Sequence, residues 1–536
     1  MKIYLPRTTV GIAPLILTVS AYFTLALNWA FFRNSYAVFG HEPGGLVFLV
    51  SLGSLLFAVT VLLLSLVCVR YLTKPVLVAF LLVAACGNYF MYRYNIIVDT
   101  TMLSNIRETD GVEVSDLLTP ALLLQVILLG VLPAALVLSA RISYPSFARE
   151  HWQRVKLACF SILLALASIE PFTAYYSSFF REHKALRYYT NPLTPVYSVS
   201  RVVGGWLASD GDHTLQIVGK DAHLPETDQD RELVILVVGE ALRSDHFGLN
   251  GYSRNTTPYL EREAVFSFPR AFSCGTATAY SVPCMFSLAG RSSFDIDEAK
   301  DQENLLDVLR HAGVNVLWRD NNSDSKGVAT RVAFQNFRSD ANNPTCDTEC
   351  RDVGMLSGLD DFIVEHPEGD VVIVLHQMGN HGPAYFKRFP EEFAVFEPYC
   401  HSNRLETCSD QEIVNAYDNA VRYTDYFLGK AIEFLKGYDD RFETALLYVS
   451  DHGESLGERG IYLHGLPYYL APDSQRHIAS ALWLGNRFEA DRDIVKANTS
   501  REVSHDNYFH TVLGLLEIQT AVYQPELDLL RPLGMQ

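Results

Sequence analysis

LVILVVGE, residues 233–240, is a run of six apolar residues that ends in glycine and one acid. An apolar run without alternation is typical of a strand that is buried on both faces of a sheet. A carboxylate directly after such a strand is costly unless it is paired or binds a metal. The alternative is an acid that caps a helix. The segment predicts a sheet of the α/β class with a functional edge at Glu240.

The same pattern recurs along the C-terminal two thirds of the chain. Further buried strands are predicted at 314–318, 371–375 and 445–449, and helices at 304–312 and 410–438. Alternating strands and helices give a mostly parallel central sheet with helices on both faces.

Acids and histidines follow these strands. Asp451, His452 and Glu454 come directly after 445–450, and His381 and His464 each precede glycine. The carboxyl ends of parallel strands meet at one edge of a sheet, so these side chains are expected to lie together. A lone histidine is more often structural, but several such clusters favour a metal. Oxygen and nitrogen donors without thiolate indicate zinc or manganese, and the histidines favour zinc.

A hydroxyl-rich segment is the expected source of a nucleophile. Residues 273–286 read SCGTATAYSVPCMF. A metal and a helix dipole can both ionise a hydroxyl at a helix N-terminus. These arguments leave Thr276, Thr278 and Ser281 open. In the loop 321–326, Asn322 and Lys326 are candidates to hold phosphate oxygens, the alternative being a polar surface loop.

The first third of the chain predicts five membrane spans. They are 10–32, 46–69, 75–94, 120–140 and 155–175. Each is long enough to cross about 30 Å of hydrocarbon. Buried core helices are the alternative for any one of them. No small-residue cleavage site follows the first span, so a signal peptide does not fit.

Charge and cysteines indicate which side the C-terminal part faces. One set of loops carries Lys2, Arg7, Arg70, Lys74, Arg141, Arg149, Arg154 and Lys156, whereas the other carries Arg33, Arg93 and Arg107. The richer set is cytoplasmic, so five crossings export the C-terminal domain. Its six cysteines lie in close pairs, which favours disulfides; the alternative is a zinc–thiolate site. The net charge of −18 argues against a nucleic acid partner.

Several segments together resemble the lipid A phosphoethanolamine transferases, including the mobile colistin-resistance enzymes. They are CGTATAYSVPCMFS (274–287), WRDNNSDSKG (318–327), HQMGNHGPAY (376–385) and SDHGESLGE (450–458). The resemblance covers essentially the full length. It implies an alkaline-phosphatase-like catalytic domain of the alkaline phosphatase and sulfatase superfamily.

The resemblance also implies roles for individual residues. Thr278 corresponds to the threonine that receives phosphoethanolamine, and it joins Glu240, Asp451 and His452 around one tightly bound Zn²⁺. His381 and His464 correspond to catalytic residues that serve the substrate phosphate and a possible second zinc. Substrate-binding positions are implied at Asn322, Lys326 and Glu454, and donor-lipid positions at Asn105, Thr109 and Glu113. The implied disulfides are Cys274–Cys284, Cys346–Cys350 and Cys400–Cys408.

Two departures from the family pattern stand out. Cys346 and Cys350 are only four positions apart, which makes that bridge tight. His477 is followed by Ile478 where the resemblance leads us to expect proline, so His477 is given no role.

We therefore expect a transmembrane domain at 1–178, membrane-surface or linker helices at 179–229 and a periplasmic zinc-dependent catalytic domain at 230–536. The expected reaction transfers phosphoethanolamine from phosphatidylethanolamine to lipid A through a phospho-threonine, giving polymyxin resistance. The expected location is the bacterial inner membrane, as a multi-pass monomer. Alternatives are another envelope glycan acceptor, a glycerol-phosphate transferase, a phosphodiester or sulfate-ester hydrolase of the same superfamily, and a non-enzymatic membrane sensor.

Overall fold

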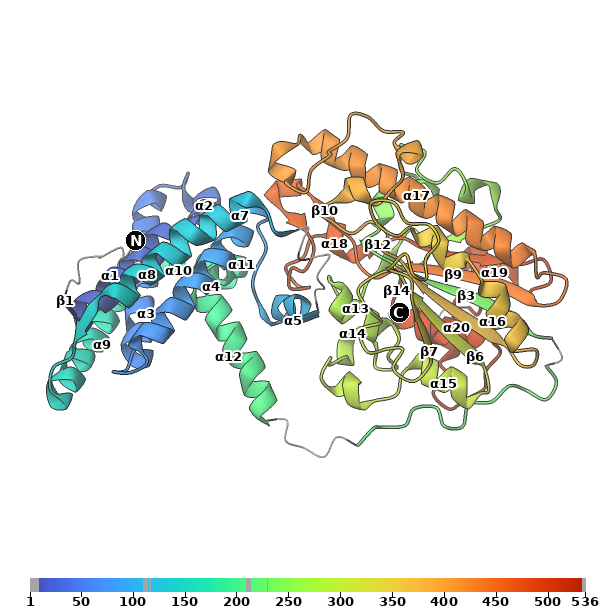
Figure 1. Cartoon of the computed structure of the whole chain (residues 1–536), viewed down its shortest axis with the longest axis horizontal. Helices are drawn as coiled ribbons and strands as arrows, with labels where there is room; N and C mark the ends of the chain where they lie inside the picture. Colours follow the sequence, from blue (N-terminus) through green and yellow to red (C-terminus); the bar gives the residue numbers. More distant parts are fainter. Residues whose placement is uncertain (1–8, 109–113, 115–116, 209–213, 229, 533–536) are drawn as a thin grey trace. The chain divides into compact units, whose positions relative to one another are not determined.

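The computed structural model describes residues 9–108, 114, 117–208, 214–228 and 230–532. The chain forms two compact units, one of residues 1–103 and 118–210 and the other of residues 104–117 and 211–536 (Figure 1). The first is helical, and the second is built on a seven-stranded sheet.

Long apolar helices make up the first unit. Four stretches are long and apolar enough to cross a membrane: Gly45–Val67, Thr73–Arg93, Pro120–Ser139 and Phe147–Arg181. The bent pair Ile12–Ala26 and Trp29–Phe39 gives a fifth span if it is counted as one. The helical membrane domain is thereby confirmed. The helices are α1 (Ile12–Ala26), α2 (Trp29–Phe39), α3 (Gly45–Val67), α4 (Thr73–Arg93), α5 (Thr100–Glu108), α7 (Pro120–Val126), α8 (Leu132–Ser139), α9 (Phe147–Ile169), α10 (Thr173–Arg181), α11 (Lys184–Tyr188) and α12 (Leu193–Ala208), with short strands β1 (Thr9–Gly11) and β2 (Arg141–Ser143).

The first span differs from the straight helix that its hydropathy predicts. The axis bends by 56° between α1 and α2. At the break, Asn28 Nδ2 donates to the Asn191 carbonyl at 2.5 Å, and Asn28 Oδ1 accepts from the Asn191 amide at 2.8 Å. Asn191 Nδ2 also donates to the Leu27 carbonyl at 3.0 Å, so a distant residue supplies a backbone partner that a continuous helix would supply itself.

The second unit is a three-layer α/β domain. Its sheet runs β4-β13-β9-β3-β8-β6-β7. Strands β9, β3, β8, β6 and β7 are parallel, whereas β13 is antiparallel to both β9 and β4, so the predicted mostly parallel sheet is confirmed with a mixed edge. The strands are β4 (Phe266–Ser267), β13 (Ser480–Leu484), β9 (Glu443–Ser450), β3 (Glu232–Gly239), β8 (Val371–His376), β6 (Asn315–Asp320) and β7 (Ala333–Asn336).

Helices cover both faces of this sheet. Val234, Leu236 and Val238 of β3 join a core cluster with residues of α15 and α20. The long helix α17 lies on the other side (Figure 1) and buries Tyr417 and Val421. Burial on both faces explains the unbroken apolar run of β3. The helices are α13 (Thr278–Met285), α14 (Gly290–Ser293), α15 (Leu305–His311), α16 (Leu359–Glu365), α17 (Asp410–Lys436), α18 (Asp473–Arg476), α19 (Arg492–Asn498) and α20 (Asp506–Leu515), and the remaining strands are β5 (Ala271–Phe272), β10 (Ser455–Leu456), β11 (Tyr462–Leu463), β12 (His477–Ile478) and β14 (Val503–Ser504).

The connection before the sheet packs against this second unit. Gln216 and His223 form β-bridges to Gln302 and Gln519, and Val218 belongs to the core cluster of the sheet. A catalytic fragment should therefore begin no later than residue 214. The predicted boundary at 230 and the membrane-surface role of 179–229 stay predictions.

Candidate active site and metal centre

Two adjacent strands deliver the acids of the site to the same edge of the sheet. Gly239 of β3 pairs with Ser450 of β9, so Glu240 and Asp451 leave the sheet side by side. A Cβ at Gly239 would lie 2.3 Å from the Tyr448 hydroxyl, which explains the glycine before the acid. The Ala241 amide donates to Asp451 Oδ1 at 3.1 Å and fixes the turn.

Thr278 completes a buried cluster with these ligands. Its Oγ donates to Glu240 Oε2 at 3.0 Å and lies 3.3 Å from His452 Nε2. That nitrogen lies 3.3 Å from Glu240 Oε1 and 3.4 Å from Asp451 Oδ2. Glu240, Asp451 and His452 are fully buried. The structure thus brings together all four predicted residues of the first metal site.

The lone pairs of these atoms converge in a way that fits a cation. Neither Glu240 Oε1 nor Asp451 Oδ2 has a hydrogen-bond donor among the described residues. His452 Nδ1 pairs with the Gly453 carbonyl at 2.9 Å, which leaves Nε2 as the unprotonated ring nitrogen. Burial, and then the neighbouring Asp451, raise the pKa of Glu240, and burial also raises the pKa of Asp451. A divalent cation would remove this cost, and the donor set of two carboxylates and an imidazole suits zinc.

The geometry separates the three candidate hydroxyls. Thr276 Oγ donates to the Leu466 carbonyl at 2.6 Å, away from the carboxylates. Ser281 is fully buried, and no hydrogen bond of its hydroxyl is found among the described residues. Of the three, Thr278 is the one that contacts Glu240 and His452. It is also the first residue of α13, where the helix dipole favours a negative oxygen.

A histidine pair borders the cluster. The ring centroids of His381 and His464 are 5.6 Å apart, and those of His452 and His464 are 4.3 Å apart. Burial disfavours the charged form of His464, but Glu454 Oε2 at 3.0 Å from Nδ1 raises its pKa to about 9. Burial and then His464 hold the pKa of His381 well below its usual value. The two shifts run in opposite directions, so of the two histidines His464 holds a proton more readily than His381.

The second group with metal-ligand spacing is His452, Glu454 and His464. It does not include His381, for which the family resemblance implies a share of a second zinc. Both Glu454 oxygens are engaged, since Tyr385 donates to Oε1 at 3.0 Å. The second zinc at His381 and His464 stays a prediction.

The predicted phosphate-binding residues have different surroundings. Asn322 Nδ2 donates to Glu240 Oε2 at 2.9 Å and to the Gln377 carbonyl at 2.7 Å, so this amide holds a predicted metal ligand in place. Lys326 has a positive φ of 53° and donates to the Ser323 carbonyl and hydroxyl at 2.6 and 2.8 Å. Asn105 lies in α5 and is half-buried, whereas Thr109 and Glu113 lie outside the described residues.

Two buried acids were not singled out from the sequence. Asp352 accepts hydrogen bonds from Asn321 Nδ2 and from the Met378 and Gly379 amides, at 2.8 to 3.1 Å, and so ties together the loops after β6 and β8. Asp320, the last residue of β6, pairs with His376, the last residue of β8, at 2.8 Å. An acid and a histidine at two strand ends are a signal that could have identified the second pair.

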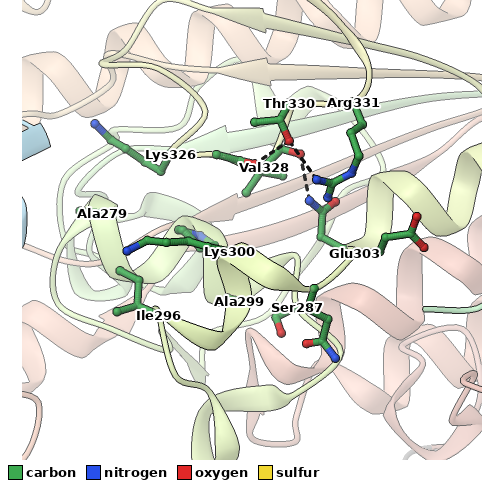
Figure 2. Close-up of a pocket in the computed structure, with 14 residues that line it drawn as sticks. Ala279, Ser287, Ile296, Ala299, Lys300, Glu303, Lys326, Val328, Thr330 and Arg331 are labelled. Carbon is green, nitrogen blue, oxygen red and sulfur yellow. Dashed lines mark hydrogen bonds between the residues drawn. The ribbon is translucent and has the colours of Figure 1, made fainter. Parts of the chain in front are cut away.

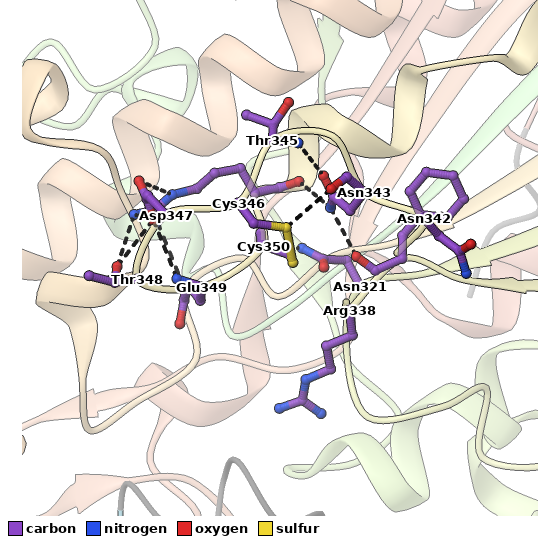
Figure 3. The surroundings of a disulfide bond; sticks show 12 residues. Asn321, Arg338, Asn342, Asn343, Thr345, Cys346, Asp347, Thr348, Glu349 and Cys350 are labelled. Atoms are coloured by element: carbon purple, nitrogen blue, oxygen red, sulfur yellow. Dashed lines mark hydrogen bonds and ion pairs between the residues drawn. A yellow bond between two sulfur atoms is a disulfide. The ribbon is translucent and has the colours of Figure 1, made fainter. Parts of the chain in front are cut away.

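Disulfides join the three predicted pairs, Cys274–Cys284, Cys346–Cys350 and Cys400–Cys408. The two cysteines of the first bridge lie on either side of Thr278 in the sequence. The second closes a small loop (Figure 3) next to Asn343, whose Nδ2 donates to the Phe337 and Arg351 carbonyls at 2.9 and 3.0 Å. The Cys350 carbonyl accepts from Asn321 Nδ2 at 2.9 Å. The first two bridges therefore lie in segments next to site residues.

Opening the Cys274–Cys284 bridge should destabilise the catalytic domain. We expect Cys274→Ser with Cys284→Ser to lower the free energy of unfolding by about 2–4 kcal/mol, because the unfolded chain regains loop entropy. Urea denaturation of oxidised protein checks this. Cys68→Ser, a cysteine of the membrane unit outside any bridge, is the control. Labelling of six free thiols in oxidised native protein would contradict the disulfide assignment.

Comparison with known proteins agrees with the fold. A family model for phosphoethanolamine transferase EptA/EptB matches residues 56–206, and one for sulfatases matches residues 232–518. The chain is 42% identical over 525 residues to phosphatidylethanolamine transferase Mcr-2 from Escherichia coli, covering 96% of this chain and 95% of the relative. It is 39% identical over 547 residues to phosphoethanolamine transferase EptA from Salmonella typhimurium, covering 99% of each.

A solved structure matches over the same length. The integral membrane protein lipooligosaccharide phosphoethanolamine transferase A from Neisseria meningitidis superposes with a TM-score of 0.93 at 35% identity, covering 98% of this chain and 99% of that one. The predicted inner-membrane location with a periplasmic catalytic domain is confirmed. With relatives above 30% identity over nearly its whole length, the chain belongs to the phosphoethanolamine transferase family, whose catalytic domain is of the sulfatase type.

Proposed function

We propose that this enzyme moves phosphoethanolamine from phosphatidylethanolamine to a phosphate of lipid A through a covalent intermediate on Thr278, with zinc as its metal. The contact of Thr278 Oγ with Glu240 and His452 carries the proposal. Relatives named for phosphatidylethanolamine and for Kdo(2)-lipid A support the two substrates. The enzyme would act as a monomer.

The metal site would be formed by Glu240, Asp451, His452 and Thr278 Oγ. A zinc ion bound there would supply positive charge that favours the ionised hydroxyl. Glu240 orients Thr278 through their 3.0 Å hydrogen bond, and Asn322 holds Glu240. Thr278 therefore presents its oxygen in a fixed direction before substrate arrives.

In the first step Thr278 Oγ passes its proton to Glu240 Oε2, to which it is hydrogen-bonded, and attacks the phosphorus of the donor. A bond from phosphorus to Oγ forms, the bond to the glycerol oxygen breaks, and that oxygen leaves with a proton as diacylglycerol. His464, which holds a proton more readily than His381, is placed to supply this proton, and His381 to hydrogen-bond the phosphoryl oxygens.

In the second step an oxygen of the acceptor phosphate attacks the same phosphorus. The bond to Thr278 Oγ breaks, and the threonine recovers its proton from Glu240. His464, which gave up a proton in the first step, takes one from the attacking acceptor phosphate. The product carries an added ammonium group, which lowers the negative charge of the outer surface. Weaker binding of cationic peptides such as polymyxin follows.

Mass spectrometry of lipid A from cells that express the full chain tests the function. Lipid A that carries added phosphoethanolamine is the expected product, together with a higher polymyxin tolerance. If lipid A stays unmodified and phosphoethanolamine is found on another envelope glycan, lipid A is not the acceptor.

The membrane unit should be needed for lipid substrates. A fragment that begins at residue 214 should cleave small phosphodiesters but lose nearly all modification of lipid A, because it has no spans to meet the donor in a bilayer.

In the full chain, Glu113→Ala should reduce modification of lipid A several-fold if this carboxylate meets the donor ammonium. Glu42→Ala, which changes an exposed acid of another outward loop, should not reduce it. Full activity of the fragment would make the spans a mere anchor, and unchanged activity of Glu113→Ala would remove that residue from the donor site.

A further inference from the structure

A small sheet beside the main one leads the chain into the segment 273–278, which ends in the proposed nucleophile and is called the nucleophile segment below. Strand β5 runs parallel to β14 in this sheet. Cys274 follows β5 by two residues, and His505 directly follows β14. The His505 amide donates to the Phe272 carbonyl at 3.1 Å and continues the pairing. The pairing therefore places His505 beside the start of the nucleophile segment.

The two ring nitrogens of His505 bind two different segments of the active site. Nδ1 accepts from the Cys274 amide at 3.1 Å, and Nε2 lies 2.9 Å from the Ser450 carbonyl. An amide nitrogen only donates and a carbonyl only accepts, so Nδ1 is the acceptor and Nε2 carries the hydrogen. The side chain is buried, and burial lowers the pKa of His505 to about 4. The ring is therefore neutral at neutral pH and can make both bonds at once.

Ser450 connects His505 to the predicted metal ligands. It is the last residue of β9 and directly precedes Asp451. Its hydroxyl accepts from the Leu242 amide at 2.7 Å and donates to the His452 carbonyl at 2.9 Å. Ser450 thus holds the turn after β3 and the turn after β9 together. Through its carbonyl, His505 joins the nucleophile segment to this pair of turns.

Other contacts hold the nucleophile segment and α13 to different parts of the domain. Phe286, at the end of α13, packs against a tyrosine of α20 with ring centroids 5.2 Å apart. Thr276 donates to the Leu466 carbonyl at 2.6 Å. Ala279 borders a pocket of about 390 Å³ (Figure 2), so this side of the helix faces open space. Among these contacts and the bonds of His505, the bond from His505 to Ser450 is the one that reaches β9.

We propose that His505 is a positioning residue that sets the distance between Thr278 Oγ and the predicted metal ligands at the end of β9. One rigid ring makes both bonds, so the nucleophile segment and β9 cannot move apart without breaking one of them. The proposal rests on the proposed function, because it takes Thr278 as the nucleophile. The alternative is a purely structural role, which would change the stability of the domain but not the reaction rate of the folded protein.

The test follows the first step of the reaction in the full-length protein in detergent micelles. The first turnover of diacylglycerol release from a fluorescent phosphatidylethanolamine is measured without acceptor and at saturating zinc. His505→Ala should lower the maximal rate about 10- to 100-fold, because small displacements of reacting groups are costly. The donor concentration at half-maximal rate should change less than about threefold, since His505 orients the nucleophile and does not bind the donor.

Two conservative variants separate the two bonds. His505→Asn can still accept from the Cys274 amide, and His505→Gln can still donate to the Ser450 carbonyl, but neither side chain reaches both partners. Each should lower the maximal rate less than His505→Ala does, but below that of the wild type. If His505→Ala does not fold, these two variants decide the same question.

His510→Ala is the matched control. His510 is also a buried histidine, on α20, and its Nδ1 accepts from the Gln524 amide at 3.2 Å. The variant should lower the thermal midpoint as His505→Ala does and leave the maximal rate unchanged. An unchanged rate in the folded His505 variants, or an equal loss in His510→Ala, would overturn the positioning role. Failure of the wild-type protein to release diacylglycerol would instead overturn the proposed function.

Discussion

We expect Thr278→Ala to lower the rate of lipid A modification by at least about four orders of magnitude, because the rest of a site does not compensate for loss of the nucleophile. The folded domain should survive, since the change removes a hydroxyl and a methyl group, and Glu240 keeps its hydrogen bond from Asn322. Lipid A mass spectrometry measures the loss, and the thermal midpoint of the purified protein checks the fold.

Three variants make this result specific. Thr278→Ser keeps a hydroxyl at the same position and should retain part of the activity. Thr276→Ala and Ser281→Ala remove the other two hydroxyls that the sequence left open, and both should retain transfer. A labelled Thr276 or Ser281 in Thr278→Ala protein, found by peptide mapping after incubation with donor, would move the nucleophile.

Removal of the metal should have the second largest effect. A chelator should stop transfer and also lower the stability of the catalytic domain, because the buried oxygens Glu240 Oε1 and Asp451 Oδ2 then have neither a cation nor a hydrogen-bond donor among the described residues. A ligand present at 1,000 times its dissociation constant stabilises the folded state by about 4 kcal/mol. Thermal denaturation before and after dialysis against chelator measures this, and added zinc should restore both properties.

Substitution of the ligands gives an independent readout. Asp451→Asn should reduce the zinc content of the purified protein well below one ion per chain, as measured by elemental analysis. Asp425→Asn is the control, since Asp425 is equally buried but accepts from the Tyr259 and Leu260 amides. A chain that keeps full activity and stability without metal would refute the assignment of the cluster as a metal site.

Local sequence determined the framework of this protein. The apolar runs of β3, β8 and β9 are short and buried on both faces, so each can be recognised from a few consecutive residues. Glu240 and Asp451 could be expected at one edge because parallel neighbours end together. The membrane helices could likewise be recognised from consecutive residues, since the thickness of a bilayer fixes the length of the apolar stretch.

Tertiary structure decided what depends on partners distant in sequence. The choice among Thr276, Thr278 and Ser281 follows from contacts with Glu240 and His452, which lie 38 and 174 positions from Thr278. The bend at Asn28 likewise depends on Asn191. Hydropathy and spacing report which face of an element is buried, whereas the identity of the group that meets a side chain is set by packing between segments, which no local pattern contains.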